Sequence, residues 1–133
     1  MIRNTAVTVC GPLNVNKLGV TYVHEHLMVK PQLPDEYYIP YTLDDEAAST
    51  EETRSFSAAG GETLVEMTPI NYGRNVKAYQ RIAQATGVHV ICCTGFHKQL
   101  FMPPWFGDKT DGELYDILMN EVTNGLDDTE IHP

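Results

Sequence analysis

The sequence predicts an α/β fold in which short buried strands alternate with helices. Three observations support this prediction: short apolar runs recur along the chain, segments with helical apolar spacing follow them, and glycines stand where those helices should end. Strands that alternate with helices pair in parallel through right-handed crossovers. With 133 residues, the chain has the length of about one domain.

The first part of the chain predicts a small hairpin followed by a strand. Residues 6–10 and 11–15 read as two short antiparallel strands around a turn. Residues 20–29 are mostly apolar and predict the first strand of the main sheet. The segment 30–43 contains three prolines and three tyrosines, and we expect it to be a loop.

Two further strands are predicted at residues 63–68 and 88–94. The second of them is almost continuously apolar, as expected for a parallel strand that is covered on both faces. A helix precedes the strand at 63–68, because Asp44 or Asp45 can cap a helix that runs to about residue 59 and ends at a Gly-Gly pair.

The two later helices carry clear start and stop signals. Asn75 is the expected N-cap of a helix that Gly87 ends. Thr110 and Glu113 have the spacing of a capping box, which predicts a last helix that stops at Gly125. The order of elements is therefore strand, helix, strand, helix, strand, helix.

His24 and His26 are two residues apart inside the predicted strand 20–29. Successive side chains on a strand point to opposite faces, so both imidazoles should lie on the same face and converge on one cation. Neutral imidazole is a good ligand for zinc and similar ions, although two ligands make at most half of a tetrahedral set. The alternative is a hydrogen-bonded structural pair.

The composition excludes several classes of function. The net charge is −9, from 18 acidic and 9 basic residues, and the basic residues are isolated, so nucleic acid is not an expected partner. No apolar run is long enough to cross a membrane, and the first residues lack a secretory signal, which predicts a cytoplasmic protein. The three cysteines include the adjacent pair Cys92 and Cys93, which should point to opposite faces and form no disulfide.

Five segments, in order along the chain, resemble the phosphotriesterase-like family of the amidohydrolase superfamily. They are residues 18–27 (LGVTYVHEHL), 60–68 (GGETLVEMT), 73–75 (GRN), 86–96 (TGVHVICCTGF) and 124–131 (NGLDDTEI). The first, second and fourth are similar to the first three barrel strands of that family. The third is similar to the turn after the second strand, and the last is similar to the approach to the fourth strand.

The resemblance implies the N-terminal portion of a TIM (β/α)8 barrel. Residues 1–133 would form a single incomplete domain, with a lead-in hairpin at 1–19 and about three βα units at 20–133. A complete barrel takes about 250 residues, so we expect the chain to be part of a longer enzyme. Three strands alone would leave an open sheet edge and an uncovered interior face.

The resemblance also implies a metal-dependent hydrolase with two Zn2+ or other divalent ions per complete site. His24 and His26 match the first-strand ligands of one ion, which this chain could bind only in part. The other family ligands are a carboxylated lysine on the fourth strand, two later histidines and an aspartate on the eighth strand, and none can be placed in this sequence. No catalytic residue can be assigned within the chain, and we do not assign acid–base roles to Glu25 or Glu66.

The substrates implied by the family are small molecules with a lactone, carboxylic ester or phosphotriester group. Arg74, His97 and Lys98 follow the second and third strands, on the barrel face that carries active sites, and are candidate substrate-binding residues. Family members often have tyrosine where His97 stands, and this departure favours an anionic lactone, such as a phosphorylated sugar lactone. The alternative is that these are solvated loop cations.

Two other interpretations compete with an active hydrolase. The chain could be a non-catalytic fragment that is stable only by association with itself or with a complementary chain. It could also be a small flavodoxin-like binding domain, although the sequence lacks a glycine-rich loop that would cradle a phosphate.

Overall fold

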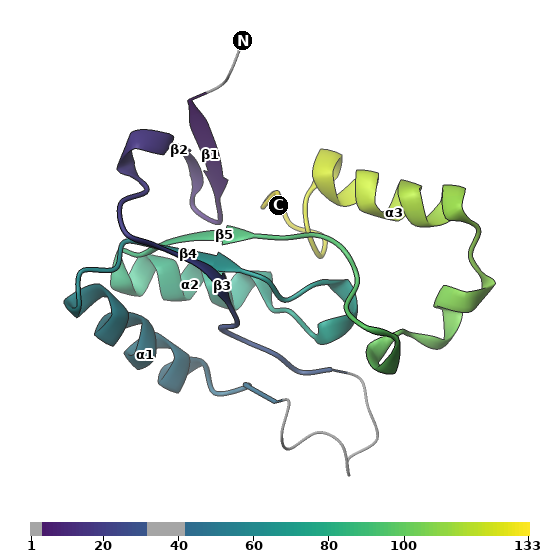
Figure 1. The fold of residues 1–133 in the computed structure, drawn as a ribbon, viewed down its shortest axis with the longest axis horizontal. Helices are drawn as coiled ribbons and strands as arrows, with labels where there is room; N and C mark the ends of the chain where they lie inside the picture. Colours follow the sequence, from purple (N-terminus) through teal and green to yellow (C-terminus); the bar gives the residue numbers. More distant parts are fainter. Residues whose placement is uncertain (1–3, 32–41) are drawn as a thin grey trace.

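The predicted alternation of strands and helices is present in the computed structural model, which describes residues 4–31 and 42–133. The elements are β1 (Thr5–Thr8), β2 (Gly11–Asn14), β3 (Thr21–Glu25), α1 (Glu46–Ala58), β4 (Thr63–Glu66), α2 (Val76–Thr86), β5 (His89–Cys92) and α3 (Asp111–Asn124). This order confirms the α/β class (Figure 1). The middle of the predicted loop, with its three tyrosines, lies outside the described residues.

The main sheet is parallel and has the strand order β3-β4-β5. β1 and β2 form a separate antiparallel hairpin, as the sequence predicts. β4 is the central strand, and Thr63 in it pairs with Thr21 of β3 on one side and with His89 of β5 on the other. Because the strands are parallel, their C-terminal ends meet at one edge of the sheet, where the side chains that follow them can form a site.

β3 lies at an edge of this sheet, and none of the described residues pairs with its outer side. Tyr22 and Val23 on this strand are 58% and 71% exposed. Apolar residues on an unpaired edge strand leave surface that another strand can cover.

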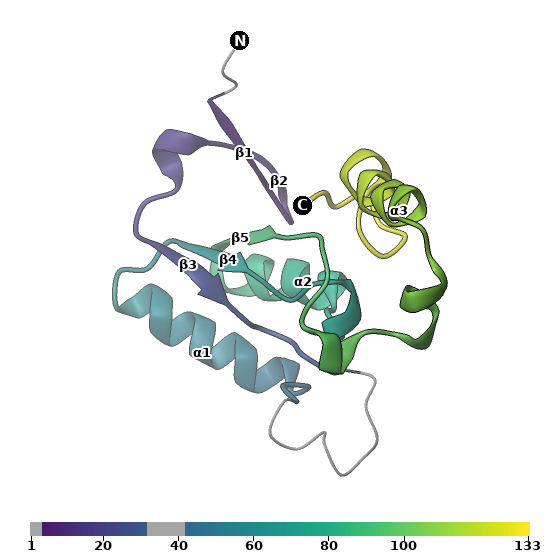
Figure 2. The same ribbon diagram turned by 45° about the vertical axis from the view of Figure 1, so that its right-hand side comes forward.

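Helices α1 and α2 lie next to each other on one side of the sheet, whereas α3 lies apart from them in both ribbon views (Figures 1 and 2). α2 presents the apolar face that the sequence pattern predicts, and Tyr79 and Ile82 on it are completely buried. α1 buries only Thr53 among its residues. The core is therefore centred on α2 and the two strands that it covers.

The predicted helix caps are confirmed. The Asp45 carboxylate accepts hydrogen bonds from two N–H groups at the start of α1, and Asn75 caps α2 in the same way. Thr110 and Glu113 form the reciprocal bonds of a capping box at α3. Gly87 ends α2 with a φ of 76°, in the left-handed region that favours glycine.

The strands are shorter than the sequence predicts. β3 ends at Glu25, although the apolar run continues to Val29, which forms an isolated antiparallel bridge with Leu43. The parallel ladder stops there because the N–H of Leu27 donates to the side chain of Glu66 and not to a strand carbonyl. The Glu66 side chain thus takes the place of the strand carbonyl that would accept from Leu27 in a continued ladder. A hydrophobic pattern in the sequence does not reveal such a replacement.

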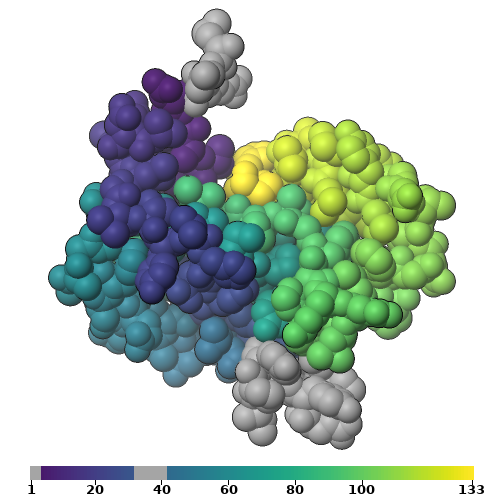
Figure 3. Space-filling view, viewed as in Figure 1, coloured from purple at the N-terminus to yellow at the C-terminus, as the bar shows by residue number. Residues whose placement is uncertain are grey.

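The N-terminal hairpin and the C-terminal segment lie side by side at the same end of the molecule (Figure 3). A cavity of about 780 Å3 lies between them and α2, with Cys10, Lys77 and His132 in its lining. It is separate from the cavity that contains the histidine pair. Among the described helices, none has the length and apolar character needed to cross a membrane.

Candidate metal centre

His24 and His26 lie where β3 leaves the sheet, at the C-terminal edge. The ladder between β3 and β4 runs up to the pair Glu25 and Glu66, which brings the end of β3 beside the residues that follow β4. The centroids of the two imidazole rings are 5.3 Å apart, with an angle of 70° between the ring planes. The two rings therefore lie together, although His26 stands one residue beyond β3 and the register between β3 and β4 shifts between Tyr22 and Glu25.

The histidine pair opens onto a cavity of about 220 Å3, which we call the histidine cavity. Its lining comes from the ends of all three parallel strands: His24, His26, Met67, Pro69, Cys93, Thr94, Gly95, Phe96 and His97. Convergence of several strand ends on one hollow is how α/β folds build binding sites.

The ring of His26 is held by specific neighbours. Its Nδ1 atom is 2.9 Å from the Oγ1 atom of Thr68, and its edge packs against Tyr72 with 5.7 Å between ring centroids. Burial lowers the pKa of His26 below its ordinary value, and the charge of His24 lowers it further. His26 is therefore kept in the neutral form that a metal ion requires.

Glu66 is the buried carboxylate behind His26. Its side chain is 0% exposed, and its Oε1 atom accepts hydrogen bonds from the Thr68 hydroxyl at 2.6 Å and from the Leu27 N–H at 3.2 Å. Burial raises the pKa of Glu66 to about 7, against the lowering effect of these hydrogen bonds. The sequence pattern does not connect Glu66 and Thr68 to His26. The one available signal is their spacing of two residues, which would put both on the same face of the predicted strand 63–68.

The geometry of the two imidazoles fits a shared ion. Rings that ligate one tetrahedral zinc at about 2.0–2.1 Å have centroids about 5 Å apart, close to the distance between His24 and His26. Neutral nitrogen donors also match the preference of zinc and similar divalent ions. Within residues 4–31 and 42–133, no group of three or more His, Cys, Asp or Glu side chains could hold a metal ion, so the two histidines would supply only part of a ligand set.

Glu25 does not join the ligand pair. Its Oε1 atom accepts a hydrogen bond from the backbone N–H of His26 at 3.1 Å, and its side chain lines a groove between β3 and α1. Glu25 thus has a hydrogen-bond partner on the backbone and does not line the histidine cavity. The three cysteines are free thiols, and Cys92 is buried.

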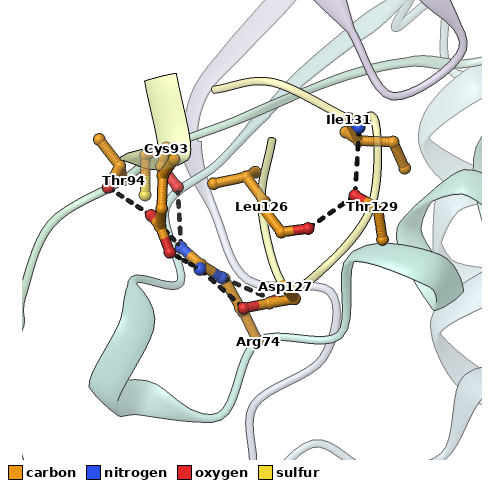
Figure 4. A network of polar contacts seen from close by, with 8 residues as sticks. Arg74, Cys93, Thr94, Leu126, Asp127, Thr129 and Ile131 are labelled. Carbon is orange, nitrogen blue, oxygen red and sulfur yellow. Dashed lines mark hydrogen bonds and ion pairs between the residues drawn. The ribbon is translucent and has the colours of Figure 1, made fainter. Parts of the chain in front are cut away.

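Arg74 does not lie in the histidine cavity, and the structure does not favour the substrate-binding role predicted for it. Its guanidinium donates to Glu121 and to both carboxylate oxygens of Asp127, at 2.9 Å from Nε and 2.7 Å from Nη2 (Figure 4). The Arg74 side chain is only 2% exposed. Burial by itself lowers the pKa of Arg74, but the hydrogen bonds and charges of Asp127 and Glu121 outweigh it and hold the pKa above the ordinary range. Its charge is thus neutralised by protein groups.

His97 does line the histidine cavity. Its ring stacks on Phe101 at a centroid distance of 5.1 Å and makes a tilted contact with Tyr72 at 4.6 Å. The backbone N–H of His97 donates to the side-chain oxygen of Asn71. Burial, followed by the charge of Lys98, lowers the pKa of His97. Lys98 is exposed next to it, with its Nζ atom 5.4 Å from the ring centroid of Phe101. Two of the three candidate substrate-binding residues therefore stand at or beside the cavity.

Comparison with known proteins agrees with this arrangement. The model of the Phosphotriesterase family matches residues 4–133. A phosphotriesterase-related protein of Nematostella vectensis is 31% identical over 98% of this chain and 47% of its own length. A phospho-furanose lactonase of Mycoplasmopsis synoviae is 34% identical over 96% of this chain and 38% of its own length.

Solved structures show the same likeness. A lactonase from Listeria monocytogenes superposes with a TM-score of 0.87 and 28% identity, over 96% of this chain and 45% of that protein. An organophosphorus hydrolase from Deinococcus radiodurans gives a TM-score of 0.81 and 30% identity, over 96% of this chain and 41% of that protein. The chain thus spans less than half the length of these relatives and corresponds to the N-terminal part of their barrels. With its family match over residues 4–133, the chain belongs to the phosphotriesterase family.

Proposed function

We propose that this chain contributes His24 and His26 to a zinc or other divalent-metal centre of a phosphotriesterase-family hydrolase. The observation that carries the proposal is the spacing of the two imidazole rings, 5.3 Å between centroids, at the wall of a cavity built from three strand ends. A complete centre would hold two ions, of which this chain would ligate one in part. Residues 1–133 would form part of a single barrel domain, whose remaining strands this chain does not supply.

The chemistry that such a centre supplies when it holds metal is activation of a water for attack on an ester or lactone bond. Our proposal for this chain's residues is narrower. His24 and His26 present their ring nitrogens to the cavity, and Tyr72 packs against His26 and limits its movement. The apolar lining from Met67, Pro69 and Phe96 would keep bulk water from the bound substrate.

We propose an anionic lactone as the substrate class, with Lys98 as the cation that receives its negative charge and His97 as an uncharged polar group at the cavity wall. His97 lines the cavity and Lys98 is exposed beside it, whereas Arg74 does not lie in the cavity lining. The similarity to a protein named phospho-furanose lactonase supports a phosphorylated lactone over a neutral ester. Since the three cysteines are free, we also propose that the protein resides in the cytoplasm.

The second candidate function is that of a non-catalytic fragment that associates with itself or with a complementary chain. Two observations favour it: the described residues supply only two converging metal ligands, and the exposed strand β3 leaves an unpaired sheet edge. On either proposal we expect the isolated 133 residues to have little or no turnover, because the remaining ligands must come from elsewhere.

Metal analysis by mass spectrometry, combined with a lactonase assay on the purified chain, separates the two candidates. Near-stoichiometric zinc together with turnover of a phosphorylated lactone would support a functional assembly. Zinc without turnover would support a half-site that waits for its missing ligands. Absence of both would contradict the metal-centre proposal and favour the inert fragment.

A further inference from the structure

We propose that Glu66 and Thr68 are positioning residues that fix the tautomer of His26, so that its Nδ1 carries the hydrogen and its Nε2 keeps a lone pair. This inference rests on the proposed function in one respect, because the free lone pair matters for a metal ion. The tautomer itself is a property of the metal-free chain and can be measured without any ion.

The direction of each hydrogen bond follows from the chemistry of the donors. The hydroxyl of Thr68 has a single hydrogen, and its Oγ1 atom lies 2.6 Å from Oε1 of Glu66. Oε1 is an acceptor, since it also receives the Leu27 N–H. The hydroxyl hydrogen of Thr68 therefore points to Glu66.

That assignment leaves only lone pairs on Thr68 to face the imidazole. The Oγ1 atom of Thr68 is 2.9 Å from Nδ1 of His26, so Nδ1 must donate the hydrogen in this contact. In a neutral imidazole only one nitrogen carries hydrogen, and Nε2 is then left with its lone pair. A ligating histidine held in this way by its other nitrogen is preorganised for metal.

Glu66 acts on His26 through Thr68 and not directly. The Oε1 atom of Glu66 is 3.8 Å from Nδ1 of His26, which is too long for a hydrogen bond. The carboxylate cannot swing toward the ring, because it is completely buried and the N–H groups of Leu27 and Thr68 both donate to it. The hydroxyl of Thr68 is thus the link that carries the orientation from a fixed carboxylate to the ring.

His24 provides an internal comparison. Within the described part of the chain, its ring makes an edge contact with His26 and no hydrogen bond. The two members of the pair therefore differ: His26 is held in one tautomer by the protein, and His24 is free to adjust.

The test is the imidazole nitrogen NMR spectrum of the metal-free 133-residue chain at about pH 8, well above the ordinary histidine pKa of about 6.5. We expect His26 to show the pattern of Nδ1–H with an unprotonated Nε2. Thr68→Val removes the hydroxyl with little change of shape and should release that tautomer, whereas Thr68→Ser keeps the hydroxyl and should retain it. In all three chains, His24 should give the same signals.

The Nε2–H pattern in the unchanged chain would overturn the inference, as would a His26 pattern that Thr68→Val leaves unaltered in a folded protein. If Thr68→Val fails to fold, the spectra of the unchanged chain and of Thr68→Ser still decide, because a dominant Nε2–H form in either contradicts the proposal.

A zinc titration separates this inference from the proposed function. If zinc binds, Thr68→Val should weaken its affinity by about 10–100-fold, the usual effect of losing an outer partner of a ligand. Equal affinity of the two chains would count against the positioning role. An unchanged chain that shows Nδ1–H at His26 but binds no zinc would support the positioning of His26 and contradict only the metal centre.

Discussion

At the scale of single residues, the main electrostatic feature is a carboxylate with no access to water. Glu66 is 0% exposed and pairs with hydroxyl and N–H donors instead of a cation. Hydrogen bonds to the charged form only partly offset the loss of hydration, and burial therefore determines the direction of its pKa shift.

This shift predicts a pH-dependent stability. The pKa of Glu66 is about 7 in the folded chain and lies above its ordinary value of 4.5, so the folded state binds the proton more tightly. The contribution of Glu66 to the free energy of unfolding should be greatest below pH 4.5 and should fall as the pH rises through 7. The measurement is urea unfolding of the metal-free chain at a series of pH values between 4.5 and 7. Glu66→Gln should make the free energy of unfolding depend less on pH in this range.

Glu52→Gln is the matched control, because Glu52 is exposed on α1. It should leave the slope of the profile unchanged. A Glu66→Gln profile with the same slope as that of the unchanged chain would show that Glu66 does not titrate in this range.

Some contacts of single residues can be predicted from the sequence and others cannot. The His24 and His26 pair could be predicted, because strand alternation fixes the directions of neighbouring side chains. The link from His26 to Thr68 could not, since it joins residues 42 positions apart. The ion pairs of Arg74 could not be predicted either, because its partners Glu121 and Asp127 lie 47 and 53 positions away in the sequence. Without these partners in view, the sequence leaves Arg74 available as a substrate-binding candidate.

At the scale of elements, the turn between β4 and α2 depends on a close backbone approach. Gly73 has a φ of 72°, and a Cβ atom at this position would lie 1.9 Å from the carbonyl oxygen of Lys30. The N–H of Lys30 in turn donates to the carbonyl of Gly73 at 3.2 Å. This turn therefore fixes the segment after β3 against the segment after β4, next to the histidine cavity.

Gly73 and Gly87 form a matched pair for a stability test. Gly87 has a similar φ of 76° but open space at its Cβ position. Gly87→Ala should cost roughly 1–2 kcal/mol from the left-handed conformation alone. Gly73→Ala should cost about 1–3 kcal/mol more, because the added methyl group meets backbone.

Denaturant unfolding of both variants measures the difference. Equal losses in the two variants would show that Lys30 moves aside without cost and that the close approach is unimportant.

The elements themselves were predicted well where local chemistry decides them. Caps at Asp45, Asn75 and Thr110 depend on side chains within three residues of the helix start, and all are confirmed. Strand ends were predicted less well, because they depend on partners from other parts of the chain. β3 stops four residues early for this reason, where Glu66 takes over the N–H of Leu27.

At the scale of the whole molecule, the chain is a partial sheet with one apolar edge. This edge exposes Tyr22 and Val23 of β3, by 58% and 71%, and Val20 just before the strand, by 62%. The α/β class could be predicted from the alternation of elements, but the barrel required the family resemblance, because three strands do not determine how a sheet closes.

The exposed edge predicts association. We expect the chain to sediment as oligomers at high concentration, and Val23→Lys should shift it toward monomer, since charged residues protect edge strands from pairing. Tyr115→Lys is the control, because Tyr115 is 61% exposed on α3, away from this edge. Sedimentation velocity decides, and equal association of the two variants would exclude β3 as the contact.

If His24 and His26 supply part of the ligand set of one metal ion, calorimetric titration of the 133-residue chain with Zn2+ should detect it. We expect at most one ion to bind per chain, and this binding should be lost in His24→Ala and in His26→Ala. His132→Ala should bind as the unchanged chain does, because Nδ1 of His132 bonds to the carbonyl oxygen of Val122 and His132 does not line the histidine cavity. Zinc binding that survives replacement of both His24 and His26, or no binding by the unchanged chain, would show that these two histidines do not form part of a metal site.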